Sequence, residues 1–119
     1  MSIGSAEVPH VKRDEIPPGT LYLLILKALS LHGPLHGYEM ANFIQQSSED
    51  VLQVEEGSLY PALQRMLLKG WVKAEWGVTA GNRRARYYRL TPAGRKQLTV
   101  ELSQFERVFG AIQRITQIA

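Results

Sequence analysis

The spacing of apolar residues changes abruptly at Gly70, and few folds accommodate such a change. Before Gly70, the stretch GSLYPALQRMLLK (57–69) repeats apolar residues at the intervals of a helix packed on a core: Leu59, Ala62, Leu63, Met66 and Leu67. After Gly70, WVKAEW alternates, GVTAGNRRA is rich in turn residues, and RYYRL is again extended. The sequence therefore predicts a helix followed directly by a β-hairpin that reverses near Gly81-Asn82.

Local signals suggest where this helix begins and ends. Ser58 suits the N-cap, where a hydroxyl accepts a hydrogen bond from a free backbone N–H. Pro61 would then fall in the first turn, where a missing N–H costs little. Gly70 suits the position just after the last helical residue, where the backbone often turns left-handed. We expect the helix between Ser58 and Gly70.

Two helices precede this unit and one follows it. Apolar patterns predict helices over about 21–31 and 37–46, a strand candidate at Val51–Val54 in the connector, and a last helix from Thr91-Pro92 to about residue 117. Three helices followed by a hairpin make a winged helix-turn-helix, a mainly α fold with a small β-hairpin. We expect a polar tail at 1–18, the winged helix-turn-helix domain at 19–91 and a C-terminal helix at 92–119.

Positive charge is concentrated in one part of the chain. Residues 65–96 hold nine basic residues and one acid, a balance of +8, whereas the whole chain carries only +3. Residues 1–64 hold three basic and eight acidic residues, a balance of −5. A solvated basic face is the alternative explanation, but this concentration is typical of a surface that binds phosphates.

Composition argues against several other functions. The chain has no cysteine, and its three histidines, His10, His32 and His36, lack metal-ligand spacing. No nucleophile–base pair, carboxylate dyad or phosphate loop is visible, so we expect no catalysis, no metal and no cofactor. The apolar run at 21–31 is interrupted by Lys27 and is far shorter than the ~20 residues of a membrane span. The first residues lack the order of a secretory signal, and we expect a soluble cytoplasmic protein without a membrane partner.

The polar face of the third helix has the chemistry of a DNA-reading surface. Gln can pair with adenine, Arg can pair with guanine, and an apolar ring can contact a thymine methyl. Three arginines expected at the tip of the wing, Arg83, Arg84 and Arg86, would contact the DNA backbone or the minor groove, although they could serve solubility alone. Tyr38 could equally pack or reach a phosphate, and Trp71 and Trp76 are expected in a core or interface. The predicted contacts to double-stranded DNA are Ser58, Tyr60, Pro61, Gln64, Arg65, Lys69, Arg83, Arg84, Arg86 and Tyr38.

The last helix carries a heptad pattern. Its apolar residues recur at intervals of four and three: Leu98, Leu102, Phe105, Phe109 and Ile112. A winged-helix core could absorb only the first turns of such a helix. The remainder could fold back on its own domain, but a homodimer is the simpler prediction. A two-fold dimer would also place two recognition helices on half-sites of a palindromic operator, about 34–36 Å apart.

Three blocks of sequence resemble the PadR family of bacterial transcriptional regulators. They are LYLLILKALSLHGPLHGYEM, GSLYPALQRMLLKGWV and RRARYYRLTPAGRKQL, which follow one another from about Gly19 to Leu98. The chain is similar to the compact subgroup, in which a single C-terminal helix serves dimerisation. The resemblance implies a dimeric regulator, usually a repressor. A winged helix used only for protein–protein contact is the main alternative, and the wing arginines argue against it.

The resemblance also implies a place for an effector. In compact members that respond to drugs, an aromatic side chain of the last helix stacks on flat ligands between the subunits. Counted from YYRLT, the matching position is Phe105, with Phe109 one turn later. Either these two residues line a pocket for a small hydrophobic effector, or they only pack the dimer. Phe has a smaller ring than Trp, which would weaken stacking on a ligand.

Overall fold

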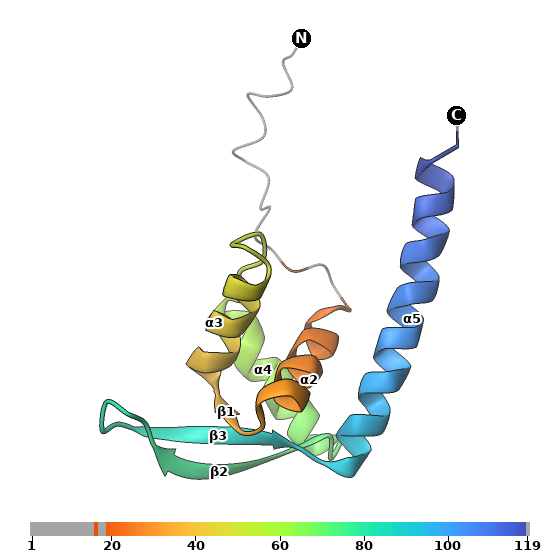
Figure 1. Ribbon diagram of the computed structural model, residues 1–119. Helices are drawn as coiled ribbons and strands as arrows, with labels where there is room; N and C mark the ends of the chain where they lie inside the picture. Colours follow the sequence, from red (N-terminus) through yellow and green to blue (C-terminus); the bar gives the residue numbers. More distant parts are fainter. Residues whose placement is uncertain (1–15, 17–18, 119) are drawn as a thin grey trace.

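A computed structural model describes residues 16 and 19–118 of the chain. In this part the helices are α2 (Leu21–His32), α3 (Gly37–Ser47), α4 (Glu56–Leu68) and α5 (Pro92–Thr116). The strands are β1 (Leu35–His36), β2 (Val72–Val78) and β3 (Arg84–Leu90). Helices α2, α3 and α4 form a bundle over one end of the β2–β3 hairpin, and α5 runs alongside (Figure 1). The predicted winged helix-turn-helix is confirmed, while the predicted tail lies outside the described residues except for Ile16.

The sheet contains a strand that the sequence did not indicate. Its order is β1-β3-β2, with both pairings antiparallel, and Leu35 lies opposite Tyr88. The strand predicted at Val51–Val54 is wrong, because these residues form no strand and Val51 is exposed. Instead, the two residues of β1 use the edge of β3 that β2 leaves open. So short a strand carries no alternation that sequence analysis could detect.

The core is built from the apolar stripes of the three bundled helices and the inner ends of the strands. In α4, the predicted inward residues Leu59, Leu63 and Met66 are buried, and Leu67 is partly buried. The other members of the core cluster are Ile25, Leu26, Leu29, Met40, Ala62, Val72 and Tyr88. Because the hairpin is longer than this core, only its inner end is covered, and the outer end projects past the helices (Figure 1).

Helix α4 begins earlier than expected. Glu55 is its N-cap, and the Ser58 N–H already donates to the Glu55 carbonyl at 3.0 Å. Ser58 is therefore not the N-cap, and Pro61 lies in the second turn rather than the first. The predicted C-terminal signal is confirmed: Gly70 has φ +76°, its N–H donates to the Leu67 carbonyl, and the Trp71 N–H donates to the Met66 carbonyl. These two hydrogen bonds end the helix, and the chain then continues into β2.

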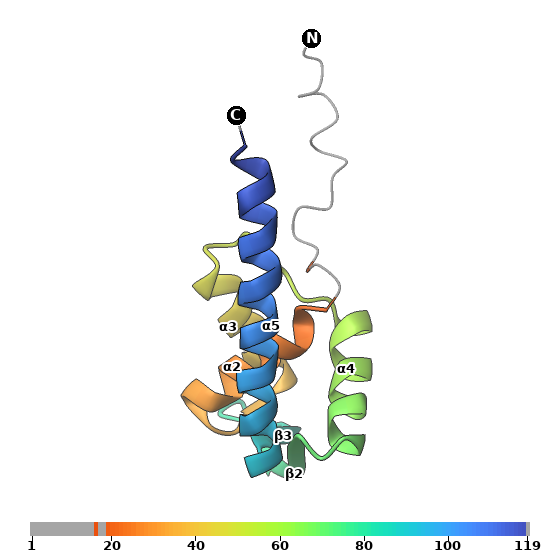
Figure 2. The same ribbon diagram turned by 90° about the vertical axis from the view of Figure 1, so that its right-hand side faces the viewer.

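The start of α5 is fixed against the start of β2. Thr91 caps the helix by accepting a hydrogen bond from the Gly94 N–H at 3.0 Å, as predicted, and its hydroxyl lies 2.6 Å from the Gly70 carbonyl. A Cβ on Gly94 would lie 2.1 Å from the Trp71 carbonyl oxygen, so only glycine fits there. Beyond this joint α5 packs beside α2 and then rises away from the bundle (Figures 1 and 2).

The apolar row of α5 changes character along the helix. Leu98 packs against the core, whereas Leu102, Phe105, Phe109 and Ile112 are 39–51% exposed. The aromatic rings of Phe105 and Phe109 stack on each other, with centroids 5.5 Å apart and an interplanar angle of 8°. None of the helices in the described residues has both the length and the apolar character needed to span a membrane.

Candidate nucleic-acid interface

The exposed face of α4 presents the side chains that the sequence assigned to DNA contact. Pro61 and Gln64 are exposed directly opposite the buried stripe, while Tyr60 and Arg65 lie on the two flanks of that face. Ser58 and Lys69, at the two ends, are exposed as well. The predicted outward face is therefore present, and its two flanks have different surroundings.

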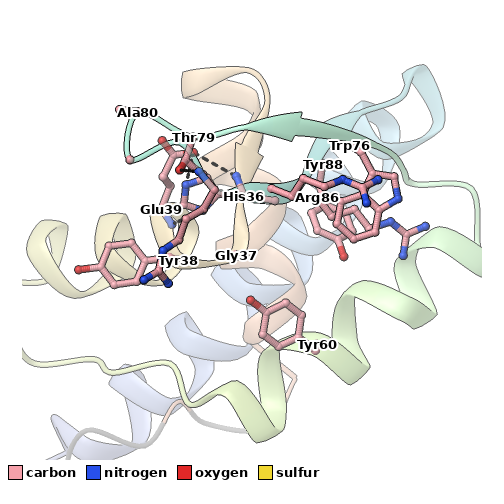
Figure 3. A pocket seen from close by; sticks show the side chains of 14 residues that line it. His36, Gly37, Tyr38, Glu39, Tyr60, Trp76, Thr79, Ala80, Arg86 and Tyr88 are labelled. Carbon is pink, nitrogen blue, oxygen red and sulfur yellow. Dashed lines mark hydrogen bonds and ion pairs between the residues drawn. The ribbon is translucent and has the colours of Figure 1, made fainter.

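Tyr60 stands against the first residue of α3. A Cβ built on Gly37 would lie 2.5 Å from the Tyr60 hydroxyl oxygen, and Figure 3 shows that hydroxyl pointing toward Gly37. Partial burial raises the pKa of Tyr60, and the nearby Glu56 carboxylate and the Tyr88 phenol add to the increase. A phenol is protonated at neutral pH even with its ordinary pKa, and the increase acts in the same direction, so the hydroxyl can donate to a phosphate oxygen.

A hollow of about 890 Å³ separates Tyr60 and the start of α3 from the hairpin. Five of the predicted contacts line it: Tyr38, Tyr60, Arg83, Arg84 and Arg86. The other five, Ser58, Pro61, Gln64, Arg65 and Lys69, are not among its lining residues. The predicted site thus divides between this hollow and the exposed outer face of α4.

Tyr38 belongs to the rim of this hollow and not to the core. It is 75% exposed, and its ring stacks on His36 with a centroid separation of 6.4 Å. His36 caps α3 in a reciprocal pair, in which its Nδ1 accepts from the Glu39 N–H and its own N–H donates to Glu39 Oε1 at 3.1 Å. Of the two alternatives for Tyr38, packing in the core is therefore excluded.

The arginines of the hairpin lie farther from its tip than predicted. The reversal is at 79–83, where the Thr79 N–H donates to the Arg83 carbonyl at 2.8 Å and Asn82 has φ +64°. Arg84 and Arg86 are strand residues paired with Val78 and Trp76. The expectation that all three arginines sit at the tip is wrong, because both strands continue beyond the predicted WVKAEW and RYYRL.

Trp76 belongs to the site, although it was expected in a core or interface. Trp71 packs partly against the core, as expected, but Trp76 is 60% exposed and lines the hollow. The guanidinium carbon of Arg84 lies 4.6 Å from the centroid of the Trp76 ring. Trp76 shares its strand face with Val72 and Ala74, which pack in the core, but the length of the hairpin carries Trp76 past the core.

The other flank of α4 is held by aromatic residues of α2 and β2. Arg65 Nε donates to the Tyr22 hydroxyl at 2.6 Å, and Lys69 Nζ lies 5.2 Å from the centroid of the Trp71 ring. Tyr22 and Trp71 contact each other edge to face, with centroids 5.4 Å apart. These two cations are therefore oriented before any ligand arrives.

The described residues offer no support for metal chemistry. Throughout 16 and 19–118, no three His, Cys, Asp or Glu side chains are grouped so as to hold a metal ion. Three arginines and four tyrosine or tryptophan side chains line the hollow, together with His36 and one carboxylate, that of Glu39. Such an arrangement can bind and orient a polyanion.

Comparisons with known proteins agree with this geometry. Residues 25–100 match the transcriptional regulator PadR-like family. A transcriptional regulator from Mycobacterium tuberculosis is 39% identical over 64 residues, which cover 54% of this chain and 59% of that protein. A transcriptional regulator structure from Clostridium thermocellum has a TM-score of 0.73 at 28% identity, covering 81% of this chain and 92% of that one.

A PadR-like transcriptional regulator from Bacillus cereus gives a TM-score of 0.71 at 25% identity and covers 85% of this chain and 95% of its own. The resemblance seen in the three sequence blocks is thereby confirmed, since the family match includes most of the bundle, the whole hairpin and the start of α5. The chain belongs to the PadR-like family of transcriptional regulators and is a DNA-binding regulator, not an enzyme.

Proposed function

We propose that this chain is a homodimeric repressor that binds a palindromic operator in double-stranded DNA. The observation that carries the proposal is that Tyr60, on one flank of the exposed face of α4, lines the same hollow as the hairpin arginines. The basic segment 65–96 supplies this surface with its charge. In this division of the chain, residues 19–91 bind DNA and residues 92–119 form the dimerisation helix.

In this proposal the outer face of α4 enters the major groove. Gln64 reads an adenine, Arg65 a guanine with the guanidinium nitrogens not engaged by Tyr22, and Pro61 contacts a thymine methyl. Ser58 lies in the first turn of α4, where the helix dipole favours a phosphate. Tyr60 and Lys69 donate to the DNA backbone on opposite flanks of the helix.

Arg83, Arg84, Arg86 and Tyr38 complete the contact from the other side of the hollow. Exposed arginines on a hairpin can approach either the phosphates or the minor groove. Tyr38, which is exposed beside His36, has its hydroxyl available for a phosphate. Together these groups would hold the DNA strand that passes between α4 and the hairpin.

Dimerisation is proposed through the exposed row on α5. Leu102, Phe105, Phe109 and Ile112 form an apolar stripe that one copy leaves half exposed, and Leu98 joins it to the core. A heptad stripe of this kind is buried best by the same helix from a second copy. Two-fold symmetry would then present two α4 helices to the two halves of an operator.

The proposal is tested by selecting binding fragments from a pool of genomic duplexes and measuring their affinity at two salt concentrations. If six or more phosphates are contacted, affinity should fall on the order of 10³-fold between 50 and 200 mM salt. Sedimentation of the free protein and of the complex gives the number of copies bound. A flat salt response, or failure to retain any duplex, would contradict DNA binding.

We also propose that a planar hydrophobic effector relieves repression by binding at Phe105 and Phe109. The near-parallel rings of these two exposed residues support this role, because a planar ligand stacks on aromatic faces and both rings present faces of the same orientation. Phe105→Ala should abolish binding of a planar aromatic dye while sedimentation still reports a dimer. Conversion to monomers, from a natural chain that never bound the dye, would show that the two rings only pack the interface.

A further inference from the structure

The two faces of the hairpin differ in a way that charge alone does not explain. On one face, Trp76 lies opposite Arg86 and Val78 lies opposite Arg84. Trp76 and Val78 are both exposed, by 60% and 63%. On the other face, Lys73 lies opposite Arg89, and Tyr87 covers Gly77, where an added Cβ would lie 2.9 Å from the Tyr87 ring.

The face with Trp76 turns toward α4. Trp76, Arg84 and Arg86 line the hollow whose other wall includes Tyr60. The exposed side chains of Trp76 and Val78 are therefore on the side of the hairpin that the proposed function assigns to DNA. A surface that contacted only phosphates would gain little from an exposed valine or from the face of an indole ring, because phosphate oxygens are bound by cations and hydrogen-bond donors, and an indole has a single N–H donor at its edge.

The minor groove of DNA matches both properties of this face. Its walls are sugar rings with apolar C–H groups, and proteins that enter it combine arginines with apolar side chains. Where the groove is narrow, as in runs of A·T pairs, its negative potential is enhanced and attracts arginine. A G·C pair instead places an amino group on the groove floor.

We propose that Trp76 and Arg84 enter the minor groove beside each half-site and select A·T pairs there. This inference rests on the proposed function and adds a second region of sequence preference to it. The Arg84 guanidinium lies over the indole, 4.6 Å from the ring centroid, so its orientation is largely set before DNA binds. Arg84 is thus the reading group and Trp76 both positions it and contacts the sugar wall.

The test uses the full chain and a duplex selected for binding, with base analogues placed only in the flanks of the half-sites. Replacing adenine by 2,6-diaminopurine adds an amino group to the minor groove floor and leaves the major-groove edge unchanged. Replacing it by 7-deazaadenine changes only the major-groove edge. We expect the first substitution to weaken binding about 5-fold or more, and the second to have little effect.

Two variants of equal charge change decide which face reads the flank. Arg84→Ala and Arg89→Ala each remove one exposed arginine from β3, on opposite faces of the hairpin. We expect Arg84→Ala and Trp76→Ala to lose the preference for adenine over diaminopurine, and Arg89→Ala to keep it. Equal affinity of the natural chain for the two flanks, or the same loss in Arg89→Ala, would overturn the inference.

Fluorescence gives an independent readout. The chain has two tryptophans, so Trp71→Phe leaves Trp76 as the only indole. Bound duplex should shield Trp76 from quenching by acrylamide, by roughly 2-fold or more if the indole lies in the groove. Full quenching in a complex that forms normally would reject the inference while leaving DNA binding intact. Failure to bind any duplex would instead remove the proposed function, and this inference with it.

Discussion

The surface proposed to contact DNA, which consists of the outer face of α4 and the hollow and is called the DNA-facing surface below, exposes cations. Helix α5 exposes apolar side chains, and the two sets of side chains have different surroundings. Around α4, the exposed cations are held in place by neighbouring rings, with Arg65 on Tyr22 and Arg84 on Trp76. On α5, Phe105 and Phe109 contact each other, while the residues around them are open to solvent. The cations of the first surface are therefore oriented without a ligand, whereas the apolar row of α5 would be packed only in the proposed dimer.

This difference predicts that α5 tolerates change least. Phe109→Asp would place a charge in the proposed dimer seam, where an unpaired buried carboxylate costs about 3–5 kcal/mol. We expect a monomer at micromolar concentration in sedimentation, and operator affinity lowered at least 100-fold, since each half-site would bind alone. Ser103→Asp, which adds the same charge at an exposed position on the polar side of the helix, is the control. A Phe109→Asp dimer with normal affinity would show that the stripe is not the interface.

The DNA-facing surface should be most sensitive where Gly37 meets Tyr60. Gly37→Ala would force the Tyr60 ring away, because the new Cβ would lie 2.5 Å from its hydroxyl oxygen. We expect a loss of about 1–3 kcal/mol in the free energy of unfolding, measured with urea, together with weaker DNA binding.

The same change in a Tyr60→Ala background provides the control. Without the ring there is nothing to displace, and alanine is the better helix former, so Gly37→Ala should be neutral or stabilising by about 0.5–1 kcal/mol. Additive effects of the two substitutions would mean that Gly37 does not position Tyr60.

Base reading and backbone contact should separate within the DNA-facing surface. Gln64→Ala should reduce discrimination at one base pair of the operator by about 1–3 kcal/mol. Arg86→Ala should weaken binding to specific and unrelated duplexes alike, because a backbone contact carries no sequence information. Competition binding against single-base operator variants measures both effects. A changed preference in Arg86→Ala, with an unchanged one in Gln64→Ala, would reverse these roles.

The smallest expected effect tests how Arg65 is held. Tyr22→Phe removes the hydroxyl that accepts the 2.6 Å hydrogen bond from Arg65 Nε and keeps the ring against Trp71. Tyr22→Phe should make the free energy of operator binding less favourable by about 0.5–1.5 kcal/mol. The same substitution should have no effect in an Arg65→Ala background. An equal loss in both backgrounds would show that Tyr22 acts elsewhere.

Features with a repeating signal could be predicted from the sequence. The stripe of α4, the hairpin and the long helix α5 each repeat a period over several residues, and the inward direction of the α4 stripe followed correctly. The C-terminal end of α4 was also predictable, because Gly70 adopts a left-handed backbone conformation that few other residue types adopt without strain.

Contacts between distant residues could not be predicted in this way. Tyr22 and Arg65 are 43 positions apart, and Gly37 meets Tyr60 only because α3 and α4 cross at that point. The length of the hairpin beyond the core decided the exposure of Trp76, which had been expected in a core or interface. Local patterns specify which side of an element faces inward, but the end of the core depends on the whole assembly.

The joint between β2 and α5 has a consequence for the spacing of an operator. Gly94 packs closely against the Trp71 carbonyl, and the Thr91 hydroxyl donates a hydrogen bond to the Gly70 carbonyl. These two contacts fix the direction in which α5 leaves the domain. In the proposed dimer, one such joint in each copy would fix the distance and the relative orientation of the two α4 helices. Inserting about 5 base pairs between the half-sites would turn one of them to the far side of the double helix, about half a helical turn away. A flexible connection between α5 and the domain would let each α4 follow its rotated half-site, but the packed joint holds α4 in place. The dimer would then bind only one half-site at a time.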